Sequence, residues 1–311
     1  MKHIIIRTNF SKEVGLGHIF RMKHLAKELS KKSKLTFYLD NYNELIEQIL
    51  NFECQYLYKK NQKFQSQRID SIKLKNEIKN KKIDCIIVDD YRLDAEWEKT
   101  FYTKIPIVVF DDYNFRKHKC DIIVDAKWTG KLTYKRYNGL VNKKTLKLCG
   151  PNFSIINSYK RKTKKSSIFK ILFYIGGGGD FNKYLNFLFH FSEKIKKNKK
   201  YKIFVICGPL ARGQKKLKDI SKKNKNIVII YNNLNISKIL SETNLYVGVS
   251  SSIIYELNYL NVLSVLFASS ANQKNDIMHL KDLGFNFLIS DKDFFLRKEK
   301  VCDFLILLIK N

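Results

Sequence analysis

Short runs of apolar and β-branched residues alternate with helical patterns along the whole chain. The runs are continuously apolar, which is typical of strands that helices cover on both faces of a parallel sheet. In the first half of the chain, the predicted strands are residues 3–7, 34–40, 85–91, 105–112 and 120–126. In the second half, they are residues 169–179, 201–208, 226–233, 245–252, 262–268 and 285–290.

The helical patterns between these runs complete a repeated strand–helix order. Residues 18–30 give the clearest helix, because apolar side chains recur there on one stripe of a 3.6-residue period. Residues 158–167 are polar and basic without such a period, and we expect a linker there. The sequence therefore predicts two Rossmann-like, doubly wound α/β domains, residues 1–157 and 168–311, that face each other across a cleft. A helix is expected to close the chain, and packing of this helix back on the first domain is one option.

The composition narrows the possible functions. The chain of 311 residues carries a formal net charge of +30, which is a reason to consider a polyanionic partner. However, only nine of its 59 basic residues are arginines, and the lysines are spread over nearly every predicted helix. Nucleic-acid readers cluster their charge and use arginine for base edges. We interpret the charge as a solvated, lysine-rich surface and do not expect a nucleic-acid partner.

Neither the cysteines nor the chain ends indicate secretion or a membrane. The six cysteines are scattered without a Cys-x-x-Cys pair, which fits buried thiols in a reducing cytoplasm. The apolar runs near the two ends are too short for a signal peptide or a membrane span. His18 and His24 are six residues apart, on different helix faces, and do not form a metal site. We expect a cytoplasmic protein without metal or cofactor, whose oligomeric state the sequence does not reveal.

Polar residues gather directly after predicted strands, where ligands bind in doubly wound sheets. The first group is the turn Gly15-Leu16-Gly17-His18, which opens the first predicted helix. The glycines allow close approach of a ligand, and a helix N-terminus disfavours a protonated imidazole. His18 is therefore a candidate base, and Arg21, one turn further on, is a candidate ligand for an anionic group. A glycine turn with an incidental histidine is the alternative.

An acidic pair and a tyrosine, Asp89, Asp90 and Tyr91, stand at the end of the third predicted strand. Such a pair is a common feature of functional sites, but it is also a common helix-start signal. Asp111 and Asp112 repeat the pattern at the next strand and are weaker candidates.

Two loops of the second domain have residue types that suit a diphosphate. The glycine-rich turn at residues 174–183 offers backbone N–H groups but lacks the lysine and Ser/Thr of a P-loop. Residues 247–257 place three serines at a strand end, and Glu256 follows at a position from which a carboxylate accepts hydrogen bonds from both ribose hydroxyls. A structural turn and a serine-capped helix are the respective alternatives. Asn272 and Gln273, after the next strand, are further polar candidates.

These four motifs, in this order, resemble those of the UDP-2,4-diacetamido-2,4,6-trideoxy-β-L-altropyranose hydrolases of pseudaminic acid biosynthesis, over nearly the whole chain. That family is similar in fold to GT-B glycosyltransferases such as the lipid II GlcNAc transferase. The residues that match its N-terminal signature, Arg-x-Asp-x-Ser-x-x-x-Gly-x-Gly-His-x-x-Arg, are Arg7, Ser11, Gly15, Gly17, His18 and Arg21. Asn9 stands where the signature has aspartate, and an amide cannot act as a base.

The resemblance implies a role for each group of residues. His18 would be the general base toward the attacking water, Tyr91 would lie in the substrate site, and Asn9 would replace the family carboxylate. The residues that would bind the substrate are Gly15, Gly17, Arg21, Asp90, Gly176, Gly177, Asp180, Asn182, Ser251, Ser252, Glu256, Asn272 and Gln273.

The implied reaction is hydrolysis of the bond between the anomeric carbon and UDP. It releases a free 2,4-diacetamido sugar for nonulosonic acid, a building block of surface polysaccharide. A neutral imidazole takes a proton from the attacking water, and diphosphate leaves once hydroxyl and amide groups meet its charge. A GT-B glycosyltransferase, with an acceptor in place of water, is the alternative, and an apolar acceptor patch on the first domain would favour it. A non-catalytic protein that binds a polyanion is the third interpretation.

Overall fold

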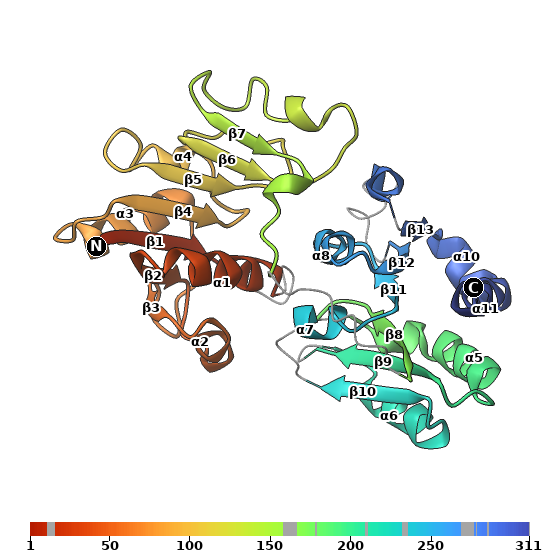
Figure 1. The fold of residues 1–311 in the computed structure, drawn as a ribbon. Helices are drawn as coiled ribbons and strands as arrows, with labels where there is room; N and C mark the ends of the chain where they lie inside the picture. Colours follow the sequence, from red (N-terminus) through yellow and green to blue (C-terminus); the bar gives the residue numbers. More distant parts are fainter. Residues whose placement is uncertain are drawn as a thin grey trace. The chain divides into compact units, whose positions relative to one another are not determined.

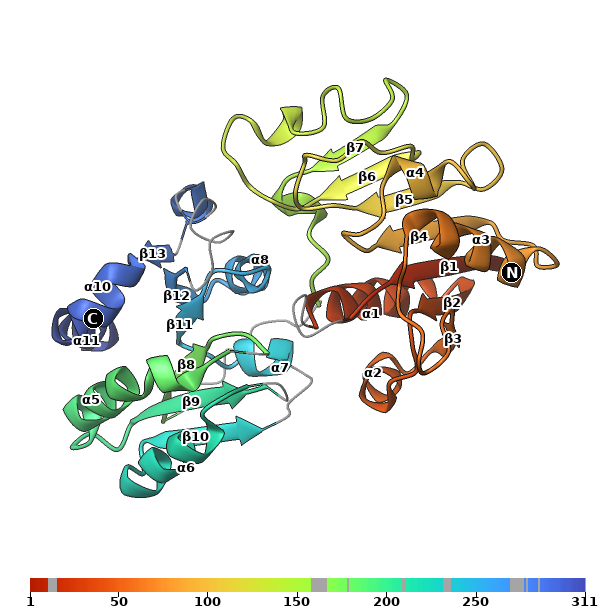
Figure 2. The same ribbon diagram turned by 180° about the vertical axis from the view of Figure 1, so that it is seen from behind.

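The computed structural model describes residues 1–10, 16–157, 167–177, 179–208, 211–231, 236–268, 277, 279–284 and 286–310. Contacts divide the chain into two units, Met1–Ile156 and Asn157–Asn311. Each unit is a parallel sheet with helices on both faces (Figures 1 and 2). The prediction of two doubly wound α/β domains is confirmed. The predicted linker lies almost wholly outside the described residues.

The first unit contains a seven-stranded sheet in the order β3-β2-β1-β4-β5-β6-β7, in which all neighbours are parallel. Its strands are β1 (Lys2–Thr8), β2 (Ser33–Leu39), β3 (Glu53–Tyr56), β4 (Cys85–Asp89), β5 (Ile107–Phe110), β6 (Ile122–Asp125) and β7 (Leu146–Cys149). The strand order reverses between β1 and β4, and ligands bind at such a switch point in doubly wound sheets. The edge strands β3 and β7 were not predicted, because both are short and mix polar with apolar residues.

Four α-helices cover the two faces of this sheet, and α1 begins and ends one residue before the predicted helix. The helices are α1 (Gly17–Leu29), α2 (Glu44–Leu50), α3 (Gln67–Ile78) and α4 (Ala95–Glu98), with the 3-10 turns η1 (Thr133–Lys135) and η2 (Pro151–Phe153) after β6 and β7. α1 and α2 pack on the face of Ile6 and Ile87, whereas α3 and α4 pack on the face of Ile5 and Ile86. Alternate residues of each strand therefore meet different helices.

The second unit contains a six-stranded parallel sheet in the order β10-β9-β8-β11-β12-β13. Its strands are β8 (Phe169–Tyr174), β9 (Tyr201–Cys207), β10 (Ile227–Tyr231), β11 (Leu245–Val249), β12 (Leu263–Phe267) and β13 (Asn286–Leu288). All six lie inside the predicted runs. They are short and mostly apolar, and the central strands β11 and β12 are almost wholly buried between two helical layers, which is the pattern that identifies parallel strands most clearly.

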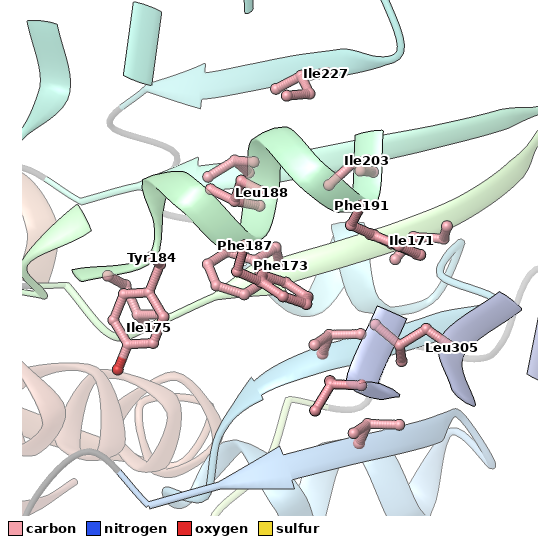
Figure 3. Close-up of a cluster of buried hydrophobic side chains, with 14 of the residues drawn as sticks. Ile171, Phe173, Ile175, Tyr184, Phe187, Leu188, Phe191, Ile203, Ile227 and Leu305 are labelled. Atoms are coloured by element: carbon pink, nitrogen blue, oxygen red, sulfur yellow. The ribbon is translucent and has the colours of Figure 1, made fainter. Parts of the chain in front are cut away.

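The helical layers of the second unit bury two separate apolar clusters. The helices are α5 (Leu185–Ile195), α6 (Gln214–Lys223), α7 (Ile236–Leu240), α8 (Ile253–Tyr259), α10 (Asp291–Leu296) and α11 (Lys298–Lys310), with the 3-10 turns η3 (Phe181–Lys183) and η4 (Lys281–Leu283). In the larger cluster, Phe173 of β8 packs against Phe187 of α5, with ring centroids 5.7 Å apart (Figure 3). Leu305 of α11 belongs to the same cluster. The final helix thus packs on the core of the second unit, and the option that it also packs on the first domain stays a prediction.

None of the helices in the described part of the chain has the length and the apolar character that a membrane crossing requires.

We expect Trp97→Ala to destabilise the first unit by about 3–5 kcal/mol, the usual cost of deleting a buried aromatic side chain. Trp97 is fully buried, and its indole N–H donates to Asp70 at 2.8 Å. Urea unfolding of the full chain, followed by circular dichroism, measures the loss. Ile72→Ala is the control in the same unit, because Ile72 is 47% exposed, and it should change stability by no more than about 0.5 kcal/mol. Equal midpoints for the two variants would contradict the assignment of Trp97 to the core.

Candidate active site at the carboxyl edge of the first sheet

Two acidic pairs stand at the carboxyl ends of neighbouring strands, Asp89-Asp90 at β4 and Asp111-Asp112 after β5. Side chains alternate between the faces of a strand, so each pair places one carboxylate on each face. Asp89 and Asp112 bind side chains of α1. Asp90 and Asp111 instead bind arginines of the loops that follow β4 and β5. The doubled aspartates thus serve two separate networks.

The α1 face of this edge holds an imidazole–carboxylate pair. His18, in the first turn of α1, is 5% exposed, and its Nδ1 lies 2.5 Å from Oδ1 of Asp89. Burial opposes ionisation of Asp89, but the charge of Arg21 and the hydrogen bonds from His18 and Arg21 outweigh it and lower the pKa of Asp89 to about 2. An ionised carboxylate only accepts hydrogen bonds, so Nδ1 carries a proton. The lone pair of Nε2 is then the basic position of the ring.

Arg21 joins this pair to the second carboxylate of the face. Its Nε and Nη2 donate to Asp89 at 3.0 and 2.6 Å, and its Nη1 donates to the two oxygens of Asp112 at 3.1 and 2.8 Å. Burial disfavours the charged guanidinium, but Asp112 and Asp89 more than compensate and raise the pKa of Arg21. Three nitrogens of Arg21 are therefore engaged with carboxylates, and its predicted contact with a substrate anion stays a prediction.

Tyr91 contacts both His18 and Asp112. Its ring meets the His18 ring edge-on, with centroids 4.3 Å apart and an interplanar angle of 77°, and its hydroxyl donates to Asp112. Burial and the charge of Asp112 raise the pKa of Tyr91, so the hydroxyl stays protonated. Tyr113 packs against Tyr91 as well, with ring centroids 4.5 Å apart. The structure thus brings Tyr91, which was predicted as a site residue, into direct contact with His18.

Two other predicted site residues of the first unit, Asp90 and Gly17, do not belong to the contacts between His18, Asp89, Arg21, Asp112 and Tyr91. Asp90 is nearly buried and accepts hydrogen bonds from Nε and Nη2 of Arg92 at 2.9 and 2.6 Å, so its carboxylate is engaged within the fold. Gly17 begins α1, and a Cβ added there would meet no described atom within 4 Å. Gly17 is not among the glycines with a positive φ. The feature that distinguishes Gly17 is the lack of any described atom near its Cβ position.

Three predicted site residues, Gly15, Asn272 and Gln273, lie outside the described residues, as does Ser11 of the N-terminal signature. Asn9 lies directly after β1, at the same sheet edge as the acidic pairs, and is 7% exposed.

In the glycine-rich loop of the second unit, one glycine is needed for the backbone conformation and another borders open space. Gly176 has φ +87°, a left-handed conformation that favours glycine, whereas a Cβ on Gly177 would meet no described atom within 4 Å. A Cβ on Gly208 would lie 2.3 Å from the carbonyl oxygen of Gly177, so the end of β9 touches this loop. Asp180 accepts hydrogen bonds from the backbone N–H and Nδ2 of Asn182 at 3.0 and 2.9 Å. These two predicted ligands therefore pair with each other.

Glu256, in α8, is linked to a residue that the sequence did not indicate. Oγ of Ser237, in α7, donates to Oε2 of Glu256 at 2.5 Å. Burial raises the pKa of Glu256, and the Ser237 hydrogen bond opposes the rise. Ser252 precedes α8 but makes no side-chain capping bond to it, and Ser251 is half-buried. The alternative of a serine-capped helix is therefore not realised within the described residues.

Sequence analysis named Asp89 and Asp112 only as members of acidic pairs at strand ends and assigned a role to neither. The available signal was the repeat of Asp-Asp at two adjacent strands together with His18 and Arg21 on one face of α1. No group of three or more His, Cys, Asp or Glu side chains in the described ranges is arranged to hold a metal ion.

A second buried network supports the loop after β5 from the other face. Nδ1 of His118 lies 2.7 Å from Glu98, and Nε2 lies 3.5 Å from Asp111. Burial disfavours the imidazolium, but the hydrogen bonds and charges of Asp111 and Glu98 raise the pKa of His118 to about 9. Arg116 also binds Asp111 and donates to the carbonyl oxygen of Tyr91. This network thereby fixes the loops that carry Tyr91 and Asp112.

Comparison with known proteins finds similar sequences at low identity. No protein-family model matches it. The UDP-2,4-diacetamido-2,4,6-trideoxy-β-L-altropyranose hydrolase of Campylobacter jejuni is 25% identical over 287 residues, which cover 91% of this chain and 97% of that protein. The uncharacterized protein MJ1062 of Methanocaldococcus jannaschii is 25% identical over 291 residues, 87% of this chain and 56% of that protein.

Solved structures show the same fold at lower identity. MurG of Acinetobacter baumannii superposes with a TM-score of 0.63 at 13% identity, over 100% of this chain and 91% of that one. The UDP-GlcNAc 2-epimerase of Neisseria meningitidis, solved with UDP-GlcNAc bound, has a TM-score of 0.60 at 13% identity, over 100% and 92% of the two chains. The GT-B-like fold class predicted from the sequence is confirmed by this likeness.

The Glu98–His118–Asp111 network predicts a loss of stability at alkaline pH. The pKa of His118 is raised from 6.5 in the unfolded chain to about 9 in the folded chain. Its contribution is therefore fully present below about pH 6.5 and disappears as the pH rises through about 9; at 1.36 kcal/mol per pKa unit it is of order 3 kcal/mol. Urea unfolding of the wild type and His118→Gln between pH 6 and pH 10 tests this. Parallel stability profiles of the two proteins would contradict it.

Proposed function

We propose that this protein hydrolyses a UDP-linked 2,4-diacetamido-2,4,6-trideoxyhexose to UDP and the free sugar, as a step of pseudaminic acid biosynthesis. The observation that carries the proposal is the His18–Asp89 pair at the carboxyl edge of the first sheet. It occurs in a chain that is similar, over 91% of its length, to a hydrolase named for this substrate.

The geometry of the pair suits a general base. Nε2 of His18 takes a proton from water as the water oxygen forms a bond to the anomeric carbon. The bond from that carbon to the diphosphate oxygen breaks, and its electron pair leaves with UDP. Asp89, ionised and hydrogen-bonded to Nδ1, stabilises the imidazolium that results. Open space at Gly17, beside His18, gives the sugar room to approach.

Residues of the second unit supply the groups that bind UDP in this proposal. Gly177, whose Cα borders open space, and the serines Ser251 and Ser252 offer N–H and O–H donors to the diphosphate. Glu256 accepts hydrogen bonds from the ribose hydroxyls, since a carboxylate has several acceptor positions and Ser237 occupies one of them.

The amide at Asn9 is compatible with this assignment. Asn9 lies after β1, at the sheet edge that carries the His18–Asp89 pair, and an amide hydrogen-bonds without exchanging a proton at neutral pH. We therefore assign the role of base to His18 alone and propose that Asn9 orients the sugar or the attacking water.

One observation favours a glycosyltransferase as the second candidate. Tyr113, Phe115 and Tyr134, on the loops after β5 and β6, are 36%, 69% and 62% exposed. Tyr113 also packs on Phe115, with ring centroids 5.6 Å apart. Exposed aromatic side chains at the sheet edge of His18 are the kind of surface that an apolar acceptor uses.

The reaction with the proposed substrate, followed by NMR, separates these candidates. Purified protein is mixed with UDP-2,4-diacetamido-2,4,6-trideoxy-β-L-altropyranose, with a chelator and without any acceptor. Equal amounts of UDP and free sugar support the hydrolase. Binding of UDP without cleavage rejects hydrolysis of this substrate and favours the transferase.

We expect His18→Gln to lower kcat by about 10²–10⁴-fold, the usual contribution of a general base. The Kd for UDP should stay within about twofold of the wild type, because this proposal gives His18 a role toward the attacking water and assigns UDP to residues of the second unit. Turnover measured by NMR and titration of UDP by calorimetry check the two parts. A fall in UDP affinity that matches the fall in rate would reject this division of labour.

We expect Glu256→Gln to show the opposite pattern. It should weaken UDP binding by about 5–100-fold, since hydrogen bonds to a charged group contribute about 1–3 kcal/mol, and leave kcat at saturation largely unchanged. Titrations with UDP and 2′-deoxy-UDP measure the effect, and the preference for UDP should disappear in the variant. Glu299→Gln is the control, because the Glu299 side chain is 70% exposed on α11. An unchanged preference would exclude Glu256 from the ribose site.

A further inference from the structure

The guanidinium of Arg21 connects the two carboxylates of the α1 face through different nitrogens. Nε and Nη2 meet Asp89, while Nη1 meets Asp112, all within 3.1 Å. Asp89 is fully buried, and Arg21 itself is only 18% exposed in its side chain. The planar fork of an arginine matches a carboxylate in this way, whereas a lysine offers a single compact charge.

Tyr91 closes these contacts into a ring. Its hydroxyl donates to Asp112, and its aromatic ring lies against His18, which in turn binds Asp89. The sequence of contacts is therefore His18, Asp89, Arg21, Asp112, Tyr91 and again His18. Its members come from α1, from the end of β4 and from the segment after β5, so three separate elements fix one imidazole.

We propose that Arg21 is a positioning residue, which holds the His18–Asp89 pair in its working geometry through Asp112 and Tyr91, and is not a ligand for the substrate's anionic group. The proposal deepens the proposed function and rests on it, because the geometry that Arg21 holds is that of the proposed base. The hydroxyl and ring of Tyr91 act in the same way, on His18 and not on the substrate.

The physical reason lies in the buried charge. Two carboxylates on one face repel each other and lose hydration, so each needs a counter-ion. Asp89 takes two donors from Arg21 and one from His18. Without the guanidinium, the imidazole would be the sole cationic or donor partner of Asp89 among these contacts. The His18 ring would then be free to turn either nitrogen toward the Asp89 carboxylate, or to carry a proton on both nitrogens.

The imidazole itself gives a readout that needs no substrate. Two-bond ¹H–¹⁵N spectra of the protein separate the two tautomers of a histidine, and the difference spectrum against His18→Gln assigns the His18 signals. In the wild type, we expect a protonated Nδ1 and a bare Nε2. In Arg21→Lys, Arg21→Gln and Asp112→Asn, we expect signals averaged between tautomers or shifted toward the doubly protonated ring.

Kinetics supply the second readout. We expect Arg21→Lys and Asp112→Asn to lower kcat by about 10²-fold, as for misplacement of a catalytic group by about 1 Å, with KM within about twofold of the wild type. The kcat of Tyr91→Phe, which keeps the ring and loses the hydroxyl, should lie between the kcat values of these variants and that of the wild type. Arg297→Gln is the control, because Arg297 is 64% exposed on the surface of the second unit. If Arg21→Gln fails to fold, Arg21→Lys and Asp112→Asn still decide the question.

The two readouts separate failure of this proposal from failure of the proposed function. A raised KM with unchanged kcat in Arg21→Lys, and an unchanged His18 spectrum, would show that Arg21 binds the substrate anion and would overturn the positioning role. A wild type that shows the ordered tautomer but cleaves no substrate would reject the hydrolase, while loss of that tautomer in Arg21→Lys would still support the positioning role.

Discussion

Pairing of buried carboxylates with guanidinium groups, at the carboxyl edge of the first sheet, is the interaction on which the site depends. Parallel strands bring their carboxyl ends together, and here those ends carry aspartates that need counter-ions. Five of the nine arginines in the chain meet that need; the pairs are Arg7–Asp40, Arg21–Asp89, Arg92–Asp90, Arg116–Asp111 and Arg136–Asp125. The few arginines bind these carboxylates, with two contacts each at Asp89 and Asp90, whereas the many lysines lie mostly on the surface. The net charge of +30 therefore says little about function.

The need of each aspartate for a counter-ion also explains how the carboxyl edge of the first sheet carries two separate hydrogen-bond networks, one on each face. Strand alternation sends Asp89 and Asp112 toward α1, and Asp90 and Asp111 toward the opposite face. The α1 network contains an imidazole with a basic nitrogen, whereas the opposite network contains a histidine held between two acids, His118. The first arrangement suits proton transfer, and the second suits rigidity. Both histidines are buried, and they differ in their partners, because His18 meets one carboxylate whereas His118 lies between two.

Most of the fold was predictable, because buried parallel strands appear as continuous apolar runs and only the short edge strands β3 and β7 do not. The candidate site stays a prediction, and the sequence indicated which strand ends carry its polar residues but not which side chains pair with each other. His18 and Tyr91 were found from a turn and a strand end. The choice between Asp89 and Asp90 as the partner of His18 depends on strand register and helix placement, which no local pattern reveals. The Ser237–Glu256 bond joins residues of two different helices and left no signal in either segment.

The distance along the chain between His18 and Asp89 has a consequence for folding. The two residues are 71 positions apart and meet only when β1 lies beside β4 in the finished sheet. Contacts between such distant positions form late, because long loops must close first. A chain in which β1 and β4 are not yet paired therefore lacks the contact between His18 and Asp89. The geometry of this pair arises together with the pairing of the central strands.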